Sequence, residues 1–285
     1  MTNAKPSFEV VSETLCFGGR QQILTHPSDT LGCDMKLAAF LPSASEKGKR
    51  PVVWFLSGLT CSEQNVTTKA GFQRYAEQLG LVVICPDTSP RGIGIEGEDD
   101  DWDFGTGAGF YVDATQSPWS ANYRMYTYVT QELRELAAAE LPIHAETMGV
   151  TGHSMGGHGA LVMGLKNPQH YRSISAFAPI AQPTTVPWGK KAFRNYLGDD
   201  EKTWAEYDAT ALINSGARSG EILIDQGLAD NFLAEQLRPE ALERACEDAG
   251  QPLTLRKHEG YDHSYHFVST FIGDHLAFHA QRLAA

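Results

Sequence analysis

The stretch that decides the fold is Met148-Gly-Val-Thr-Gly-His-Ser-Met-Gly-Gly-His-Gly-Ala160. It contains Gly152-His-Ser154-Met-Gly156, a G-x-S-x-G pattern that an apolar strand segment enters and a helical pattern leaves. In this context the pattern predicts a nucleophile elbow, a sharp strand-to-helix turn that exposes a serine hydroxyl above a sheet. Glycine is expected at positions 152 and 156 because a side chain there would collide with the crowded backbone.

Apolar runs and helical patterns alternate on both sides of this stretch. Strands buried on both faces are predicted at 51–56, 81–85, 171–178, 221–225 and 252–257. Helices are predicted at 72–79, 123–140, 155–166, 237–249 and 263–283. Three short consecutive strands at 8–17, 21–25 and 35–41 favour an antiparallel start. The pattern predicts an α/β protein with a mostly parallel sheet covered by helices on both faces.

Composition limits the function further. The 285 residues carry a net charge of −12, which argues against nucleic acid or an anionic membrane surface as partner. The five cysteines are irregularly spaced, so neither a disulfide framework nor a zinc site is indicated. Residues 1–7 lack the apolar core of a signal peptide, and no apolar run could span a bilayer. We expect one domain over residues 1–285 in a reducing, cytoplasmic setting.

Two long segments break the alternation. Residues 88–122 are expected to be a functional loop, since their aromatic side chains argue against disorder. The acidic run 96–103 within it is interpreted as a solvated loop, with metal binding as the minor alternative because the carboxylates lack calcium-loop spacing. Residues 179–220 contain several prolines and are expected to be irregular.

A serine nucleophile needs a base and an orienting acid, which follow it in the order Asp or Glu, then His. Asp230 lies in the loop after the strand 221–225, from which it can reach a histidine. Asp225 closes that strand and is kept as the alternative, although a residue there is expected to brace the turn. After the last strand, His263 is better placed than His258 or His266 to act as the base. The developing oxyanion needs two backbone N–H donors, which the pattern assigns to Met155 and to the Gly58-Leu59 loop.

Several longer motifs resemble the S-formylglutathione hydrolase family, also called esterase D. They are Leu56-Ser-Gly-Leu-Thr-Cys-Ser-Glu-Gln-Asn65, Pro86-Asp-Thr-Ser-Pro-Arg-Gly92, Trp102-Asp-Phe-Gly-Thr-Gly-Ala-Gly-Phe-Tyr-Val-Asp113, the elbow itself, Ala178-Pro-Ile180, Pro187-Trp-Gly-Lys-Lys191, Ile224-Asp-Gln-Gly227 and Glu259-Gly-Tyr-Asp-His-Ser-Tyr265. The resemblance runs from near the N-terminus to the last helix. It implies an α/β-hydrolase fold and a serine thioesterase that hydrolyses S-formylglutathione to formate and glutathione in formaldehyde detoxification, with activity on small esters.

The resemblance also implies roles for individual residues. It implies the triad Ser154, His263 and Asp230, with oxyanion donors at Leu59 and Met155. It implies that Cys61 makes the enzyme sensitive to thiol reagents, whereas a free cysteine taken alone is more often inert packing. No metal or cofactor is expected.

A formyl group is small, so the acyl pocket should be narrow. We expect Trp102 and Trp188 to wall it, with core or lid packing as the alternative for both. Arg91, Lys190 and Lys191 are candidates for the positive charge that acidic glutathione needs. The small-molecule substrate is the expected partner, together with a second copy in a homodimer. The rivals are a general short-chain carboxylesterase of the same fold and a non-catalytic hydrolase-fold binding protein.

Overall fold

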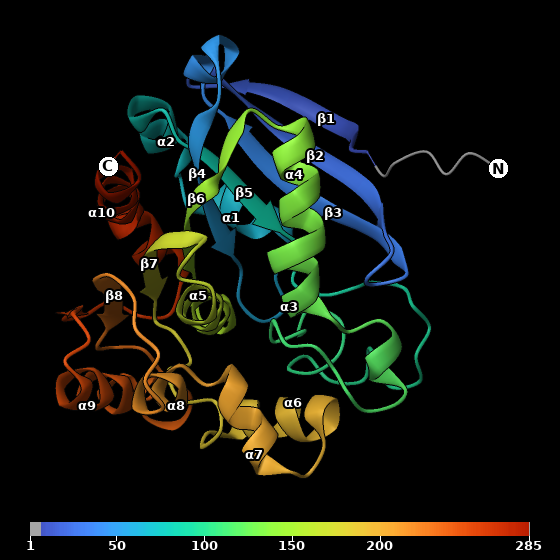
Figure 1. Cartoon of the computed structure of the whole chain (residues 1–285), viewed down its shortest axis with the longest axis vertical. Helices are drawn as coiled ribbons and strands as arrows, with labels where there is room; N and C mark the ends of the chain where they lie inside the picture. Colours follow the sequence, from blue (N-terminus) through green and yellow to red (C-terminus); the bar gives the residue numbers. More distant parts are fainter. Residues whose placement is uncertain (1–6, 285) are drawn as a thin grey trace.

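The computed structural model describes residues 7–284 (Figure 1). Residues 1–6, on which the signal-peptide prediction rests, lie outside the described residues, as does residue 285. The centre of the fold is a nine-stranded sheet in the order β1-β2-β3-β5-β4-β6-β7-β8-β9. Its strands are β1 Glu9–Cys16, β2 Gly19–Ser28, β3 Cys33–Leu41, β4 Arg50–Leu56, β5 Val82–Pro86, β6 Ile143–Gly152, β7 Tyr171–Phe177, β8 Ile222–Gly227 and β9 Leu253–His258.

The direction of the strands confirms the predicted sheet. The first three strands and β5 pair antiparallel, and every pair from β5 through β4 to β9 is parallel. The apolar run of β4 is buried from Val52 to Leu56, as expected for a strand with helices on both faces. The edge strand β1 is exposed along nearly its whole length. This is the α/β-hydrolase fold with an antiparallel N-terminal start.

Ten α-helices lie among the described residues. They are α1 Glu63–Lys69, α2 Gln73–Leu79, α3 Met125–Thr127, α4 Arg134–Glu140, α5 Met155–Lys166, α6 Pro187–Leu197, α7 Glu201–Trp204, α8 Ala209–Asn214, α9 Pro239–Ala249 and α10 Tyr265–Leu283. A π-helical segment, Tyr128–Leu133, joins α3 to α4. The last helix, α10, packs with α1 and α2, whereas α4 and α5 cover β6 and α5 contacts α8. Figure 1 shows α2 and α10 on one side of the sheet and α4 on the other.

The structure differs from the sequence predictions in four places. Residues 179–220 are not irregular, since they form α6, α7 and α8. The polar helix α1 was not predicted; Ser62 caps it and Asn65 completes a capping box. The strand β8 continues to Gly227, so Asp225 lies inside the strand rather than at its end. The helix predicted from His263 begins at Tyr265, after the capping residue Ser264, which leaves His263 in a loop.

The buried side chains form one continuous cluster across the sheet, from Leu24 in β2 to Leu276 in α10. The assignment of residues 1–285 to one domain stays a prediction. No helix within residues 7–284 is both long enough and apolar enough to cross a membrane. The carboxyl ends of β4, β5, β6, β8 and β9 lie along one edge of the parallel sheet, where α/β folds place their sites.

Candidate active site

Ser154 stands on the turn between β6 and α5. Its backbone has φ 59° and ψ −117°, a conformation that costs energy for a residue with a side chain. The neighbouring chain holds it there, because the Ser154 N–H donates to the Phe177 carbonyl at 2.9 Å and its own carbonyl accepts from the His158 N–H at 3.0 Å. A Cβ atom on Gly152 would overlap the Gly156 carbonyl, and one on Gly156 would overlap the Leu56 carbonyl. Both glycines therefore let the elbow close.

His263 meets Asp230 at the carboxyl edge of the sheet. The His263 Nδ1 atom lies 2.5 Å from Asp230 Oδ2, and the carboxylate is buried. Asp230 Oδ1 accepts a hydrogen bond from the Phe232 N–H at 2.8 Å, which fixes the direction of the carboxylate. The loops after β8 and β9 are joined by backbone, since the Ala229 N–H donates to the Tyr261 carbonyl at 2.9 Å. An acid that binds Nδ1 leaves Nε2 of the imidazole to face a nucleophile.

Asp225, the alternative acid, belongs to a different group of side chains. Its fully buried carboxylate accepts from Arg256 Nε and Nη2 at 2.5 and 2.6 Å and lies 3.2 Å from His275 Nε2. The pKa of Asp225 is lowered, because hydrogen bonds from His275 and Arg256 outweigh its burial. His275 in turn lies 2.8 Å from the Ser175 hydroxyl. This second Ser-His-Asp set is enclosed in the core, so substrate has no access to it.

Ser154 and His263 line one cavity of about 240 Å³. Its walls are formed by Gly58, Leu59, Thr60, Cys61, Trp102, His153, Ser154, Trp188, Phe232, His263 and Tyr265. Within the described residues the Ser154 hydroxyl makes no hydrogen bond to His263, a looseness that is common in free enzymes. The triad residues expected from the sequence are thus gathered around one small, mostly apolar space.

The two amides assigned to the oxyanion hole lie beside the serine. Met155 is the first residue of α5, where backbone N–H groups have no partner within the helix. Leu59 lies in the loop that follows β4, and its neighbour Gly58 is so close that an added Cβ would stand 3.2 Å from Ser154 Cβ. Neither amide donates to another residue in the range 7–284. Both are free to bind a developing oxyanion.

Aromatic rings form one wall of the cavity. Trp102 and Trp188 meet edge to face with their centroids 5.6 Å apart, and Trp188 lies 4.7 Å from Phe232. The Phe232 ring stands 5.1 Å from that of His263. Trp188 is buried, whereas Trp102 remains 56% exposed at the mouth. Phe232 was missed from the sequence, although its position two residues after Asp230 was a usable signal.

Cys61 lines the same cavity and is buried. Burial raises the pKa of its thiol, so the thiol is held in its protonated and less nucleophilic form. Tyr265, which also lines the cavity, was not singled out from the sequence. His153 was missed as well; its ring lies 4.5 Å from that of His263, and burial lowers its pKa well below the usual value.

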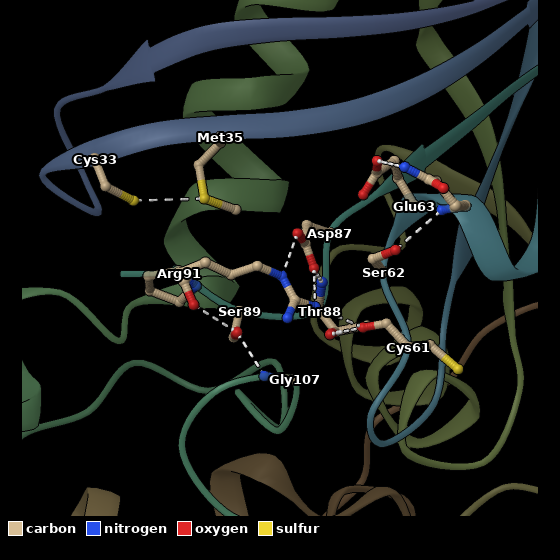
Figure 2. Close-up of polar contacts among 12 residues, drawn as sticks. Cys33, Met35, Cys61, Ser62, Glu63, Asp87, Thr88, Ser89, Arg91 and Gly107 are labelled. Carbon is tan, nitrogen blue, oxygen red and sulfur yellow. Dashed lines mark hydrogen bonds and ion pairs between the residues drawn. The ribbon is translucent and has the colours of Figure 1, made fainter. Parts of the chain in front are cut away.

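Two of the three charged candidates, Arg91 and Lys191, are bound to carboxylates, whereas Lys190 is exposed on α6. Lys191 forms ion pairs with Asp101 and Asp103, and the side chain of Glu98 is buried in the same loop. The acidic run is therefore partly tied to α6 rather than simply solvated. Arg91 pairs with Asp87, as Figure 2 shows. No group of three His, Cys, Asp or Glu side chains that could hold a metal ion occurs in the part of the chain that the structure describes.

Comparison with known proteins matches this chain to a family. The model of the Esterase family, described as "Putative esterase", matches residues 28–278. The S-formylglutathione hydrolase of Mus musculus is 55% identical over 277 residues, which cover 96% of this chain and 98% of the mouse protein. That of Paracoccus denitrificans (strain Pd 1222) is 51% identical over 97% of this chain and 99% of its own length.

A solved structure agrees with these sequence relatives. The S-formylglutathione hydrolase from Agrobacterium tumefaciens has a TM-score of 0.95 and 49% identity, and the match covers 96% of this chain and 99% of that one. Fold and elbow together define a serine hydrolase of the α/β-hydrolase class. Within that class, the chain belongs to the esterase family and to its S-formylglutathione hydrolases.

Proposed function

We propose that this enzyme hydrolyses S-formylglutathione to formate and glutathione in formaldehyde detoxification, with Ser154, His263 and Asp230 as its triad. The observation that carries the proposal is the His263–Asp230 pair, which faces the cavity holding Ser154. The full-length relatives named above supply the substrate, because both are S-formylglutathione hydrolases. The same site supports activity on small carboxylic esters, since their acyl chemistry is the same.

In the first half of the reaction, His263 Nε2 takes the proton from Ser154 as its Oγ attacks the formyl carbon. The amides of Leu59 and Met155 bind the resulting oxyanion. Asp230 holds the imidazole and stabilises its charged form. The tetrahedral intermediate then collapses and breaks the carbon–sulfur bond. Glutathione leaves with the proton from His263, and the leaving group is good because a thiol has a pKa of about 8.5.

In the second half, water replaces glutathione. His263 removes a proton from the water as its oxygen attacks the formyl-serine ester. The same two amides bind the second oxyanion, and collapse releases formate and restores the Ser154 hydroxyl. The cavity of about 240 Å³ and its wall of Trp102, Trp188 and Phe232 suit a small acyl group. We propose that Trp102 and Trp188 contact the substrate and that Cys61 borders the acyl site.

Replacing Ser154 with alanine tests the mechanism. We expect turnover of S-formylglutathione to fall by about 10⁴-fold or more while the fold is retained, because the nucleophile is lost. Circular dichroism and thermal unfolding check the fold. A Ser154→Ala protein that kept its turnover would exclude the proposed triad and favour the reading as a binding protein.

Substrate preference separates the thioesterase from a general carboxylesterase. We expect kcat/KM for S-formylglutathione to exceed that for a short-chain aryl ester. The comparison uses one enzyme preparation at one pH, so that active-site concentration cancels. Equal or reversed values would favour the general carboxylesterase.

We also propose a homodimer in which two copies meet at the edge strand β1. Large apolar side chains gather there, with exposed fractions of 53% for Val10, 54% for Val11 and 77% for Leu15. An exposed apolar edge strand is a template for pairing with another chain. Light scattering after size exclusion should give twice the chain mass, and a Val11→Asp, Leu15→Asp variant should give the monomer. A wild-type monomer at micromolar concentration would contradict the dimer.

A cytoplasmic location is part of the proposal. All five cysteines are free thiols, as a reducing compartment would keep them. The expected products, formate and a free thiol, fit the same setting. Fractionation of cells that contain the enzyme, followed by the thioesterase assay, tests the location, and activity recovered outside the cytoplasmic fraction would contradict it.

A further inference from the structure

The loop that carries the Leu59 amide has a conformation that its own sequence does not favour. The Cys61 N–H donates to the Gly58 carbonyl at 3.3 Å, which makes residues 58–61 a β-turn. Thr60 occupies its third position with φ 65°. Turns that need a positive φ at that position ordinarily use glycine, and a β-branched residue there is strained. Contacts from outside the turn must therefore hold it in this shape.

One such contact comes from the end of the neighbouring strand β5. Asp87 is buried directly after β5, and Arg91 binds it with Nε at 2.8 Å and Nη2 at 2.9 Å. The same Nη2 atom also donates to the carbonyl of Cys61 at 3.0 Å. Figure 2 shows the guanidinium between the Asp87 carboxylate and the Cys61 carbonyl. The ion pair thus fixes the arginine, and the arginine fixes the last residue of the turn.

A second donor reaches the same carbonyl. The hydroxyl of Thr88 donates to the Cys61 carbonyl, and the Thr88 N–H donates to Asp87 Oδ1 at 2.7 Å. Thr88 is fully buried, so water does not compete for these bonds. The Cys61 carbonyl therefore accepts two hydrogen bonds from one short segment, residues 87–91.

The same segment supports the middle of the turn through Gly107. The Thr60 N–H donates to the Gly107 carbonyl at 2.9 Å, and the Gly107 N–H donates to the Ser89 hydroxyl at 2.8 Å. Gly107 can approach this closely because it lacks a side chain; a Cβ there would stand 3.2 Å from Thr60 Cα. Both Thr60 and Cys61 are thus tied to residues 87–91.

We propose that Arg91 and Thr88 are positioning residues of the oxyanion hole. They hold the Cys61 carbonyl and thereby aim the Leu59 N–H at the oxyanion formed on Ser154. This role rests on the proposed function of Ser154 and the Leu59 amide. This role differs from that of a surface charge that binds glutathione. An arginine that holds the oxyanion loop through Asp87 and the Cys61 carbonyl affects the hydrolysis of every substrate, including one without a glutathione moiety. A displaced donor weakens binding of the transition state more than binding of the substrate.

Two conservative variants test the proposal. Thr88→Val removes one hydrogen bond to the Cys61 carbonyl with little change in shape. Arg91→Lys keeps a charge beside Asp87 but cannot reach both partners through a planar fork. Each change has a matched control away from the site. Thr130→Val removes a buried hydroxyl that donates to the Tyr126 carbonyl at 2.7 Å. Arg50→Lys removes an arginine that donates to the Gly80 carbonyl at 3.0 Å, at the opposite end of β4.

The readouts are kcat and KM for the neutral substrate p-nitrophenyl acetate and Ki for a trifluoromethyl ketone, which forms an oxyanion on serine. Complete loss of an oxyanion donor costs about 10²–10³-fold, so we expect each site variant to lower kcat by roughly 10-fold. KM should stay within about twofold, and Ki should rise by the same factor as kcat/KM falls. The controls should match the wild type in all three values. Guanidinium salts should partly restore kcat in Arg91→Ala but not in Thr88→Val.

Other outcomes would overturn the proposal. Wild-type values of kcat and Ki in both folded site variants would show that the turn does not need these contacts. A rise confined to KM for S-formylglutathione would make Arg91 a glutathione-binding residue instead. The choice of substrate is tested separately. If the thioester proved a poor substrate while the aryl ester followed the expected pattern, the positioning role would stand and the proposed substrate would fall.

Discussion

At the scale of single residues, the hydrogen-bond partners separate two buried aspartates that lie five positions apart. Asp230 faces a cavity through His263, whereas Asp225 is surrounded by Arg256, His275 and His258 within the core. Sequence order alone allowed either residue to be the acid. The structure distinguishes them by their partners, because only one of these carboxylates binds an imidazole that reaches the serine cavity.

The two aspartates should respond differently to the same substitution. Asp230→Asn should lower kcat by on the order of 10³–10⁴, because an amide favours the wrong tautomer of His263. Asp225→Asn should lower the free energy of unfolding by about 1–3 kcal/mol through its lost charged hydrogen bonds and should change kcat much less. Urea unfolding and steady-state kinetics on both variants provide the test. A larger loss of kcat in the folded Asp225 variant would reverse the assignment.

A site residue could be predicted from the sequence only where the residues next to it in the chain form a recognisable pattern. Ser154 could be predicted because its glycines and the flanking pattern lie within five residues. Phe232 and Tyr265 reach the cavity through tertiary packing. The only local signal for Phe232 was its position two residues after Asp230, and no local pattern marks Tyr265. Arg91 was a candidate for the positive charge that glutathione needs, but the structure pairs it with Asp87, a buried residue whose contact with Arg91 the sequence did not indicate.

At the scale of elements, the junction of β6 and α5 depends on what each glycine meets. A methyl group on Gly156 would overlap the backbone of Leu56 and Ser57, which neither can avoid without moving β4. A methyl group on Gly164, in the same helix, would meet the end of the Ile174 side chain, which can change rotamer. Gly164→Ala is therefore a matched control, within the same helix, for Gly156→Ala.

We expect Gly156→Ala to cost about 4 kcal/mol or more in unfolding free energy and to abolish activity, since the elbow cannot close. Gly164→Ala should change stability by no more than about 1 kcal/mol, because the gain in helix propensity offsets the displaced isoleucine. Thermal and urea unfolding of the two proteins measure the difference. Similar losses at both positions would show that backbone crowding at the elbow is not the cause.

The elements themselves were predicted where apolar periodicity was strong. All nine strands were located, and the long helices α5 and α10 were found to within two residues. The helix α6 was missed because the prolines around it suggested a break, whereas Pro187 in fact begins the helix at its first turn. The helix α1 was missed because it buries little apolar surface beyond Val66, so its capping box was the remaining signal.

At the scale of the whole molecule, buried histidines couple stability to pH. Burial lowers the pKa of His158 to about 4, and its Nδ1 atom has no hydrogen-bond partner in the described residues. The pKa values of His26, His153, His275 and His279 are lowered as well, each chiefly by burial. The folded chain therefore keeps these imidazoles neutral, while the unfolded chain protonates them near pH 6.5.

This difference in pKa between the folded and the unfolded chain determines how the free energy of unfolding changes with pH. Above about pH 6.5, His158 is neutral in both the folded and the unfolded chain and does not lower the free energy of unfolding. As the pH falls from about 6.5 toward about 4, the unfolded chain binds a proton at His158 that the folded chain does not, so the free energy of unfolding decreases. From the two pKa values the loss is about 3 kcal/mol for this residue. Urea unfolding at pH 7 and pH 4.5 should show a smaller decrease for His158→Gln than for the wild type. An equal decrease would assign the pH dependence to other groups.

The tryptophans in the cavity wall should make the intrinsic fluorescence of the enzyme sensitive to ligand binding. Trp188 is buried against Phe232 and Trp102 is half exposed at the cavity mouth, so their indoles emit from different surroundings. A ligand that fills the cavity shields Trp102 from water, which should move its fluorescence to shorter wavelength. A stopped-flow trace of intrinsic fluorescence can then time the entry of substrate and the departure of glutathione without any added dye.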